Sequence, residues 1–200
     1  MEKTLDTANK IAYFETELSY IKNPEYREDA RFLVGHLPDY FFEIQAASTG
    51  KYHPRYTLGE GGLLRHTKAA VRIAYELFMD PLIGNKYTAN ERDLMLIALL
   101  IHDGIKLGKD RSKYTKTDHP LLAAQYVEEN KDSLHFTKEE IEFLKDVISS
   151  HMGPWNKDFD GNEVLPIPHT KYENFVHMCD YLASRKCILF EFDENGQIIG

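Results

Sequence analysis

Residues 89–106 read ANERDLMLIALLIHDGIK, and this stretch decides the fold class. Apolar residues recur in it three and four positions apart, which predicts a buried helix. Thr88 precedes the stretch and Glu91 follows three residues later, the spacing of a capping box that begins a helix. The helix ends on His102 and Asp103, a histidine and a carboxylate at its inner end. A divalent cation would stabilise this pair, although histidine and aspartate at a helix end also serve as ordinary caps.

The remaining sequence also predicts helices, separated by turns that proline and glycine mark. We expect them over residues 4–21, 24–35, 62–79, from 120 onward, 137–151 and 171–186, with a short helix after Pro38. Residues 188–192 and 197–199 flank a turn and predict a small C-terminal β-hairpin. The fold class is therefore all-α. Its parts are N-terminal helices in residues 1–47, a helical domain in 48–187 and the hairpin in 188–200, in a single compact unit.

The composition and charge limit what the chain can bind. The chain has 200 residues, of which 42% are hydrophobic, enough for one domain with a substantial core. Its net charge of -8 disfavours binding of long nucleic acids. No uncharged apolar run reaches the roughly 18 residues of a membrane span. The N-terminus lacks the apolar segment of a secretory signal and the two cysteines fit reduced thiols, so we expect a cytoplasmic protein.

Nine histidines are present, and several fall at inward-facing helical positions together with carboxylates. His66 and His151 each lie on the apolar face of a predicted helix, His119 adjoins the start of another, and Asp180 lies in the last one. A single histidine on such a face is more often structural. As a set with His102 and Asp103 they are typical ligands of Mn, Fe, Co, Ni, Zn or Mg, and we expect one or two divalent ions. The absence of cysteine from the set argues against a structural zinc site.

The order of these residues resembles that of the HD-domain superfamily of metal-dependent phosphohydrolases. Residues 61–67, GGLLRHT, and 101–106, IHDGIK, are typical of that superfamily. Within it, the chain looks most like the HD domains attached to certain 3′-to-5′ exoribonucleases, on GGLLRHT and on TDHPLLAA (117–124), ISSHMG (148–153) and HMCDYLASRK (177–186). The resemblance covers residues 58–186 and implies an HD-type helical bundle.

This resemblance implies roles for individual residues in hydrolysis of a phosphomonoester or phosphodiester bond by a metal-activated water. His66, His102, Asp103 and Asp180 are expected to hold one ion, and Asp103 to bridge to a second ion held by His119 and His151. Lys106 matches the lysine of the HDxxK pattern and is expected to contact a phosphate oxygen. Many two-metal members have a second histidine where this chain has Met152, so the number of ions stays open.

Further residues are candidates for substrate contacts. Lys51, His53 and Arg55 fall in an irregular stretch before His66, and Lys113 belongs to a basic run after the HD pair. Each of them is equally well explained as a solvated surface cation or a packed loop residue. Two other residues lie close to the expected ligands. Trp155 is expected to wall the pocket, although a single tryptophan is more often a packing residue. His177, one helical turn before Asp180, is expected to support a ligand or to serve as an extra one.

Three functions fit this sequence. The first is a phosphohydrolase, for which the charge and the size favour a small phosphorylated substrate, a nucleotide or short oligonucleotide. The second is a non-catalytic HD-fold module that senses a nucleotide or metal without turnover. The third is an all-α interaction domain whose histidines are simply buried. Substrate, metal identity and oligomeric state are left open, because a fold does not choose among them.

Overall fold

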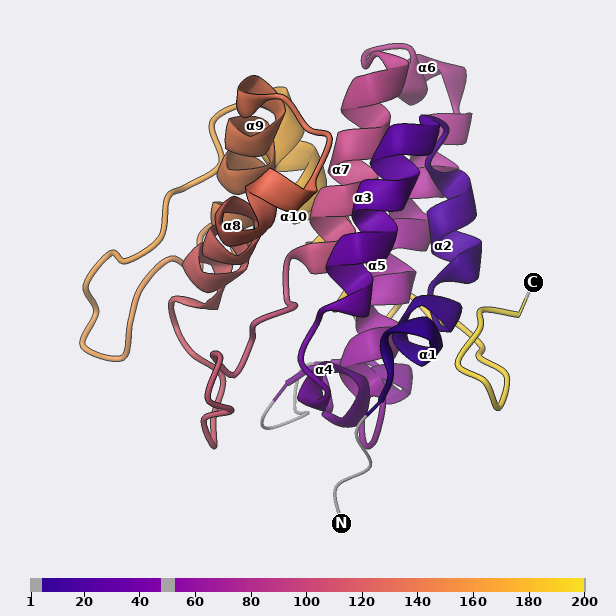
Figure 1. Cartoon of the computed structure of the whole chain (residues 1–200). Helices are drawn as coiled ribbons and strands as arrows, with labels where there is room; N and C mark the ends of the chain where they lie inside the picture. Colours follow the sequence, from indigo (N-terminus) through magenta and orange to yellow (C-terminus); the bar gives the residue numbers. More distant parts are fainter. Residues whose placement is uncertain (1–4, 48–52, 200) are drawn as a thin grey trace.

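A computed structural model of the protein describes residues 5–47 and 53–199. Over these residues the chain forms ten α-helices and two short 3₁₀-helices, with no β-strand, so the all-α class is confirmed (Figure 1). The elements are α1 (Thr7–Ala12), α2 (Glu15–Tyr20), α3 (Pro24–Gly35), α4 (Tyr40–Glu43), η1 (Arg55–Thr57), α5 (Gly62–Met79), α6 (Pro81–Gly84), α7 (Ala89–Ile101), α8 (His119–Asn130), η2 (Lys131–Ser133), α9 (Lys138–Ser149) and α10 (Lys171–Ala183).

Local signals start most of the long helices. Capping boxes begin α7, α9 and α10, through the pairs Thr88–Glu91, Thr137–Glu140 and Thr170–Glu173. In each pair the threonine side chain accepts from the glutamate backbone N–H, and the glutamate side chain accepts from the threonine backbone N–H. The bounds predicted for α3 and α5 agree with the structure, whereas α10 ends three residues before the predicted Lys186.

The single helix predicted over residues 4–21 is wrong, because the chain breaks it at Tyr13 and Phe14 into α1 and α2. At the break, the carbonyl of Tyr13 accepts hydrogen bonds from the distant Lys68 Nζ and Gln197 Nε2. Phe14 is fully buried there and packs against aromatic rings of α4. Tertiary contacts thus replace the helical hydrogen bonds that local sequence favours.

The C-terminal β-hairpin is also not formed as predicted. Its turn exists, since Asp193 accepts hydrogen bonds from the backbone N–H groups of Asn195 and Gln197. The ladder consists of one antiparallel bridge, between Phe192 and Ile198. Phe190 and Phe192 pack on the ring of Tyr56, but Leu189 at the start of this segment is 77% exposed, so only part of the segment has an apolar face to cover.

One hydrophobic core joins the N-terminal helices to the rest of the chain. Helix α7 lies at its centre, with every residue from Leu94 to Ile101 buried, and it packs against α3, α5, α9 and α10. Figure 1 shows α3 and α5 on one side of α7, with α8, α9 and α10 gathered on the other. The C-terminal end of α7 is therefore surrounded by ends of other helices. None of the helices described is both long and apolar enough to cross a membrane.

Candidate metal centre

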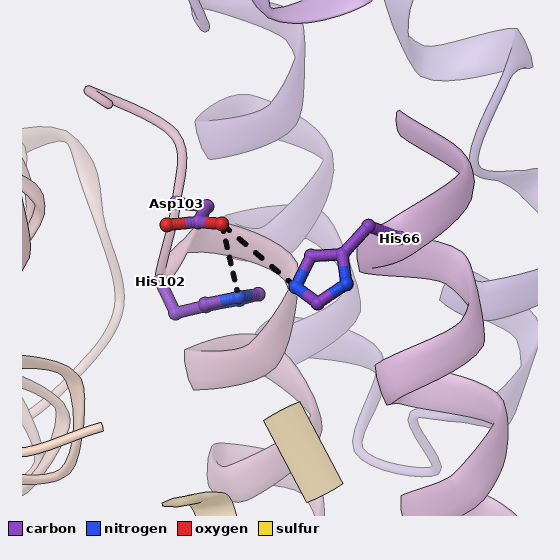
Figure 2. A group of neighbouring side chains, drawn as sticks. All are labelled: His66, His102 and Asp103. Atoms are coloured by element: carbon purple, nitrogen blue, oxygen red, sulfur yellow. Dashed lines mark ion pairs between the residues drawn. The ribbon is translucent and has the colours of Figure 1, made fainter. Parts of the chain in front are cut away.

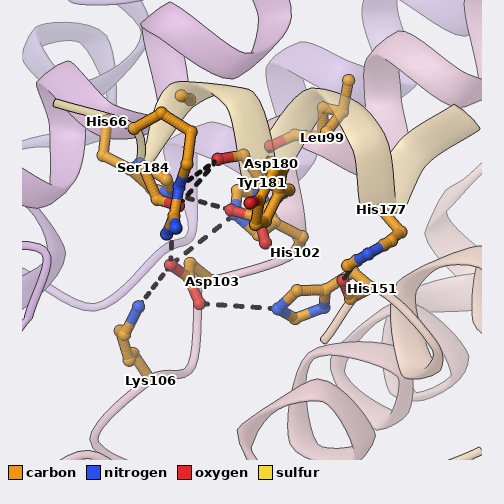
Figure 3. Close-up of polar contacts among 12 residues, drawn as sticks. His66, Leu99, His102, Asp103, Lys106, His151, His177, Asp180, Tyr181 and Ser184 are labelled. Carbon is orange, nitrogen blue, oxygen red and sulfur yellow. Dashed lines mark hydrogen bonds and ion pairs between the residues drawn. The ribbon is translucent and has the colours of Figure 1, made fainter. Parts of the chain in front are cut away.

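A buried cluster of histidines and aspartates forms around the end of α7. Each member comes from a different helix or helix end, apart from the adjacent pair at α7. The members are His66 of α5, His102 and Asp103 after α7, His119 at the start of α8, His151 after α9 and Asp180 of α10. Three subsets place one possible ligand atom from each residue within 4.8 Å of the others: His66 with His102 and Asp103; His102 with His151 and Asp180; and Asp103 with His119 and His151. Figure 3 labels the residues of the first two subsets.

Asp103 lies at the centre of the cluster and directs its two oxygens to different histidines. Its Oδ2 atom lies 3.8 Å from His66 Nε2 and 3.6 Å from His102 Nε2, as Figure 2 shows. Its Oδ1 atom lies 3.0 Å from His119 Nε2 and 3.8 Å from His151 Nε2. The carboxylate therefore divides the cluster into two halves that share it.

Three of the histidines are held in one tautomer by the backbone. The Nδ1 atoms of His102, His119 and His151 lie 2.7, 2.8 and 2.7 Å from the carbonyl oxygens of Leu99, Lys116 and Ile148. A carbonyl oxygen only accepts, so each Nδ1 carries the hydrogen and donates it. In the neutral ring, Nε2 then presents a lone pair to the cluster, which is how a metal-binding imidazole is oriented.

Buried polar atoms in the cluster lack hydrogen bonds among the residues that the structure describes. These are His102 Nε2, His119 Nε2, Asp103 Oδ1 and His66 Nδ1. A buried polar atom without a partner costs about 1–3 kcal/mol, and lone pairs that face each other repel. Cations bound at His102 Nε2, His119 Nε2 and Asp103 Oδ1 would remove both costs at these three atoms, whereas His66 directs Nε2, and not Nδ1, toward Asp103 and Asp180. The residues present could therefore hold a metal ion.

The electrostatics of the metal-free cluster favour ionised carboxylates and a neutral His151, whereas at His102 the carboxylates of Asp103 and Asp180 outweigh burial and raise the pKa. Burial alone raises the pKa of Asp103 and Asp180. At Asp103 this effect is outweighed by Lys106, His102 and His119, and at Asp180 by His102 and His66, so both pKa values lie well below the usual range. Burial, followed by the charge of His102, lowers the pKa of His151 to about 3. At neutral pH the carboxylates are thus ionised and His151 is neutral.

A cavity of about 480 Å³ opens onto the cluster. His66, Asp103, His119, His151 and Asp180 line it, whereas His102 lies fully buried beneath them. Lys106 also lines the cavity, and its Nζ atom lies 2.5 Å from Asp103 Oδ2. The volume is that of a site for a small molecule.

Trp155 and His177 both line this cavity. His177 Nδ1 lies 2.6 Å from the carbonyl oxygen of His151 and donates to it, so His177 holds the backbone of a cluster residue (Figure 3). The chain between the two passes through Gly153 at a φ of +60°, where a Cβ atom would lie 2.3 Å from His177 Cε1. A glycine is required for this close approach.

The structure does not bring Arg55 and Lys113 to the cavity. Arg55 is exposed on η1, where Pro54 and Thr57 are the buried residues, so the short turn directs Arg55 to solvent. Lys113 is exposed beside the ring of Tyr114. His53, from the same stretch as Arg55, does line the cavity, and Lys51 lies outside the described residues.

Sequence reasoning missed three residues of α10 and its C-terminal end that line the cavity: Tyr181, Ser184 and Arg185. Helical spacing was the available signal, since these positions follow His177 by four, seven and eight residues and so share its face. One face of α10 therefore forms a wall of the cavity.

Comparison with known proteins adds no assignment. No protein-family model, no curated protein and no solved structure matches the chain. The cluster and its cavity are therefore the features of the chain that bear on its function.

Proposed function

We propose that this protein is a metal-dependent phosphohydrolase of the HD type that acts on a small phosphorylated substrate, a nucleotide. The observation that carries the proposal is the orientation of three imidazoles around one carboxylate. His102, His119 and His151 each donate Nδ1–H to a backbone carbonyl, so Nε2 is left as an acceptor facing Asp103. Acceptor atoms that converge in a buried place, at the bottom of an open cavity, support a catalytic metal site.

The two halves of the cluster correspond to two groups of ligands. The group on the Oδ2 side of Asp103 consists of His66, His102 and Asp180. The group on the Oδ1 side consists of His119 and His151. Asp103 would be shared if each half holds an ion. When bound, divalent ions of this kind supply an activated water and neutralise charge on phosphoryl oxygens.

Lys106 supports the assignment of a phosphorylated substrate. Its side chain is largely buried beside Asp103, yet it lines the cavity. An ammonium group in that position binds a phosphate oxygen as a point charge. The enclosed volume and the overall charge of -8 favour a small anion over a long polymer.

The experiment combines metal analysis with an activity assay. Bound metals are quantified by mass spectrometry, and phosphate release is measured on a panel of nucleotides and phosphodiesters with added Mn²⁺. We expect near-stoichiometric metal and release by wild type, and neither by Asp103→Ala. His36→Ala is the matched control, because His36 is exposed and its Nδ1 contacts a helix carbonyl in the same way, far from the cluster in sequence.

Two outcomes would contradict the proposal. Protein without metal, even after incubation with Mn²⁺, would identify the histidines as structural. Stoichiometric metal and nucleotide binding without product from any member of the panel would favour a sensor module over an enzyme.

A further inference from the structure

Aromatic and cationic side chains form a stack at the mouth of the cavity. The rings of Trp155 and Tyr181 are nearly parallel, with centroids 5.7 Å apart and an interplanar angle of 13°. The guanidinium carbon of Arg185 lies 4.2 Å from the centroid of the Tyr181 ring. All three residues line the cavity, and none of them belongs to the cluster of possible metal ligands.

The stack is held in place from both sides. Arg185 donates from Nε and Nη2 to Ser184 Oγ, at 3.1 and 2.6 Å, and from Nε to the carbonyl of Tyr181 at 3.2 Å. Trp155 follows Gly153, whose backbone packs directly on the His177 ring of the same helix as Tyr181. Fixed side chains lose little conformational entropy on binding, so this arrangement is suited to recognition.

Two features of the stack point to a ligand. Trp155 is 52% exposed although it lines a cavity, so a large part of its ring is available to another planar group. Arg185 forms no ion pair with any carboxylate of residues 5–47 and 53–199. A guanidinium that rests on a ring and lacks a carboxylate partner leaves N–H groups for a phosphate.

The charges around the cavity indicate whether a ligand there is anionic or cationic. Among the lining residues, the carboxylates are Asp103 and Asp180, both members of the cluster. Outside the cluster the charged lining residues are Lys106 and Arg185, both cations, in a chain of net charge -8. Lys106 lies against Asp103, whereas Arg185 lies in the stack beside Trp155 and Tyr181. Arg185 is therefore a cation of the cavity lining that lies apart from the cluster.

We propose that Trp155, Tyr181 and Arg185 form a nucleotide-recognition site, in which a base stacks on Trp155 and Arg185 binds a phosphate other than the one at the cluster. Placement of the first phosphate at the cluster rests on the proposed function. The ligand is then a nucleotide with two phosphate groups, either a nucleoside diphosphate or a dinucleotide.

Fluorescence tests this site directly, because Trp155 is the only tryptophan of the chain. Titrations in EDTA use AMP, ADP and the dinucleotide pApA, with ribose 5-phosphate as the ligand that lacks a base. We expect the three nucleotides to quench Trp155 and ribose 5-phosphate to leave it unchanged. Equal quenching by ribose 5-phosphate would overturn base stacking.

Variants test each side chain, with binding followed by calorimetry. We expect Trp155→Ala to weaken nucleotide binding about tenfold and Trp155→Phe to restore most of it. Arg185→Gln should also weaken binding about tenfold. The matched controls are Phe159→Ala, an aromatic residue 93% exposed on the same loop, and Lys186→Gln, the exposed cation next to Arg185. If these controls have the same effect as the test variants, the site is refuted.

Addition of Mn²⁺ tests the second phosphate. We expect Mn²⁺ to strengthen binding of ADP or pApA more than that of AMP. Whichever of ADP and pApA gains more affinity shows whether the second phosphate belongs to a nucleoside diphosphate or to a dinucleotide. An equal gain for AMP would refute the two-phosphate requirement. The titrations in EDTA measure binding without turnover, so they test the recognition site separately from the hydrolase function. If nucleotides bind in a way that depends on Arg185 but are not hydrolysed, only the hydrolase function is refuted. Hydrolysis without quenching would refute only the recognition site.

Discussion

Asp103 Oδ1 and His119 Nε2 lie 3.0 Å apart in the interior, and neither atom forms a hydrogen bond with any residue that the structure describes. His119 Nδ1 donates to the carbonyl of Lys116, so the neutral ring has no proton at Nε2 to give to the carboxylate. Two acceptors at this distance are stabilised by a cation that both can bind. This relationship supports a metal site more directly than the number of histidines does.

Metal binding at the cluster should stabilise the fold. A cation that binds only the native state adds about 2.7 kcal/mol of stability at a free concentration of one hundred times its Kd. We expect Mn²⁺ to raise the Tm of wild type and EDTA to reverse the increase. In Asp103→Ala the Tm should not respond to Mn²⁺, as measured by differential scanning calorimetry. A wild-type Tm that is independent of both additions would contradict a native metal site.

Much of the fold was predictable because its signals are local. The capping pairs Thr88–Glu91 and Thr137–Glu140 and the apolar spacing of α7 lie within single helices. The break at Tyr13 was not predictable in this way, because the groups that bind its carbonyl, Lys68 and Gln197, come from distant parts of the chain.

The candidate site also divides into residues that local sequence predicts and residues whose position depends on tertiary packing. Histidines at helix ends were recognisable by their position on apolar faces, and the structure brings them together. Which neighbouring cation reaches the cavity depends on the path of the connecting loops, so Arg55 was selected although it points to solvent. Helical spacing indicates that Arg185 shares a face of α10 with His177, but only the packing of α10 beside α9 and α5 decides that this face lines the cavity.

Lys106 should act on the substrate and not on the metal. It contacts one oxygen of Asp103 and offers no lone pair as an ammonium, so its removal leaves the ligand set intact. We expect Lys106→Ala to retain wild-type metal content and to raise KM or lower kcat for the best substrate of the panel. Lys109→Ala is the control, because Lys109 is exposed and pairs with Glu129. Loss of metal from Lys106→Ala would show that its role lies within the cluster.

Acid should destabilise the metal-free protein through His151. Its pKa is about 3 in the folded chain against 6.5 ordinarily, since burial and then His102 oppose protonation. Between these values the unfolded chain binds a proton that the native state does not, so stability falls as the pH is lowered from 6.5. Between pH 6.5 and 5, His151 lowers the free energy of unfolding by at most about 2 kcal/mol. Urea unfolding in EDTA should show a shallower dependence on pH for His151→Gln, and an unchanged slope would contradict this origin.

Gly153 should be required for the contact between His177 and the loop that carries Trp155. An alanine there adopts a left-handed backbone, at a cost of about 1–2 kcal/mol, and its Cβ also meets the His177 ring at 2.3 Å. Gly161→Ala is a matched control, because Gly161 has a φ of +86° and open space around its Cβ position. We expect Gly153→Ala to lower the Tm more than Gly161→Ala and to change Trp155 fluorescence. Equal shifts in Tm would show that the His177 contact contributes nothing.

A buried ion pair between Lys68 and Glu17 should be critical to the N-terminal packing. Their side chains are 0% and 1% exposed, with Nζ and Oε2 3.0 Å apart, and Lys68 also binds the carbonyl of Tyr13 at the break between α1 and α2. Removing one partner leaves an uncompensated buried charge, so Lys68→Met should destabilise the fold by about 3–5 kcal/mol in urea unfolding.

The double variant Lys68→Met/Glu17→Leu should recover much of this loss, because no charge is left without its partner. Lys131→Met, which removes the exposed pair with Glu128, should leave the unfolding midpoint unchanged. If the double variant were no more stable than Lys68→Met, the hydrogen bonds of Lys68 to Tyr13 and Gln197, and not the ion pair, would be the contribution that matters.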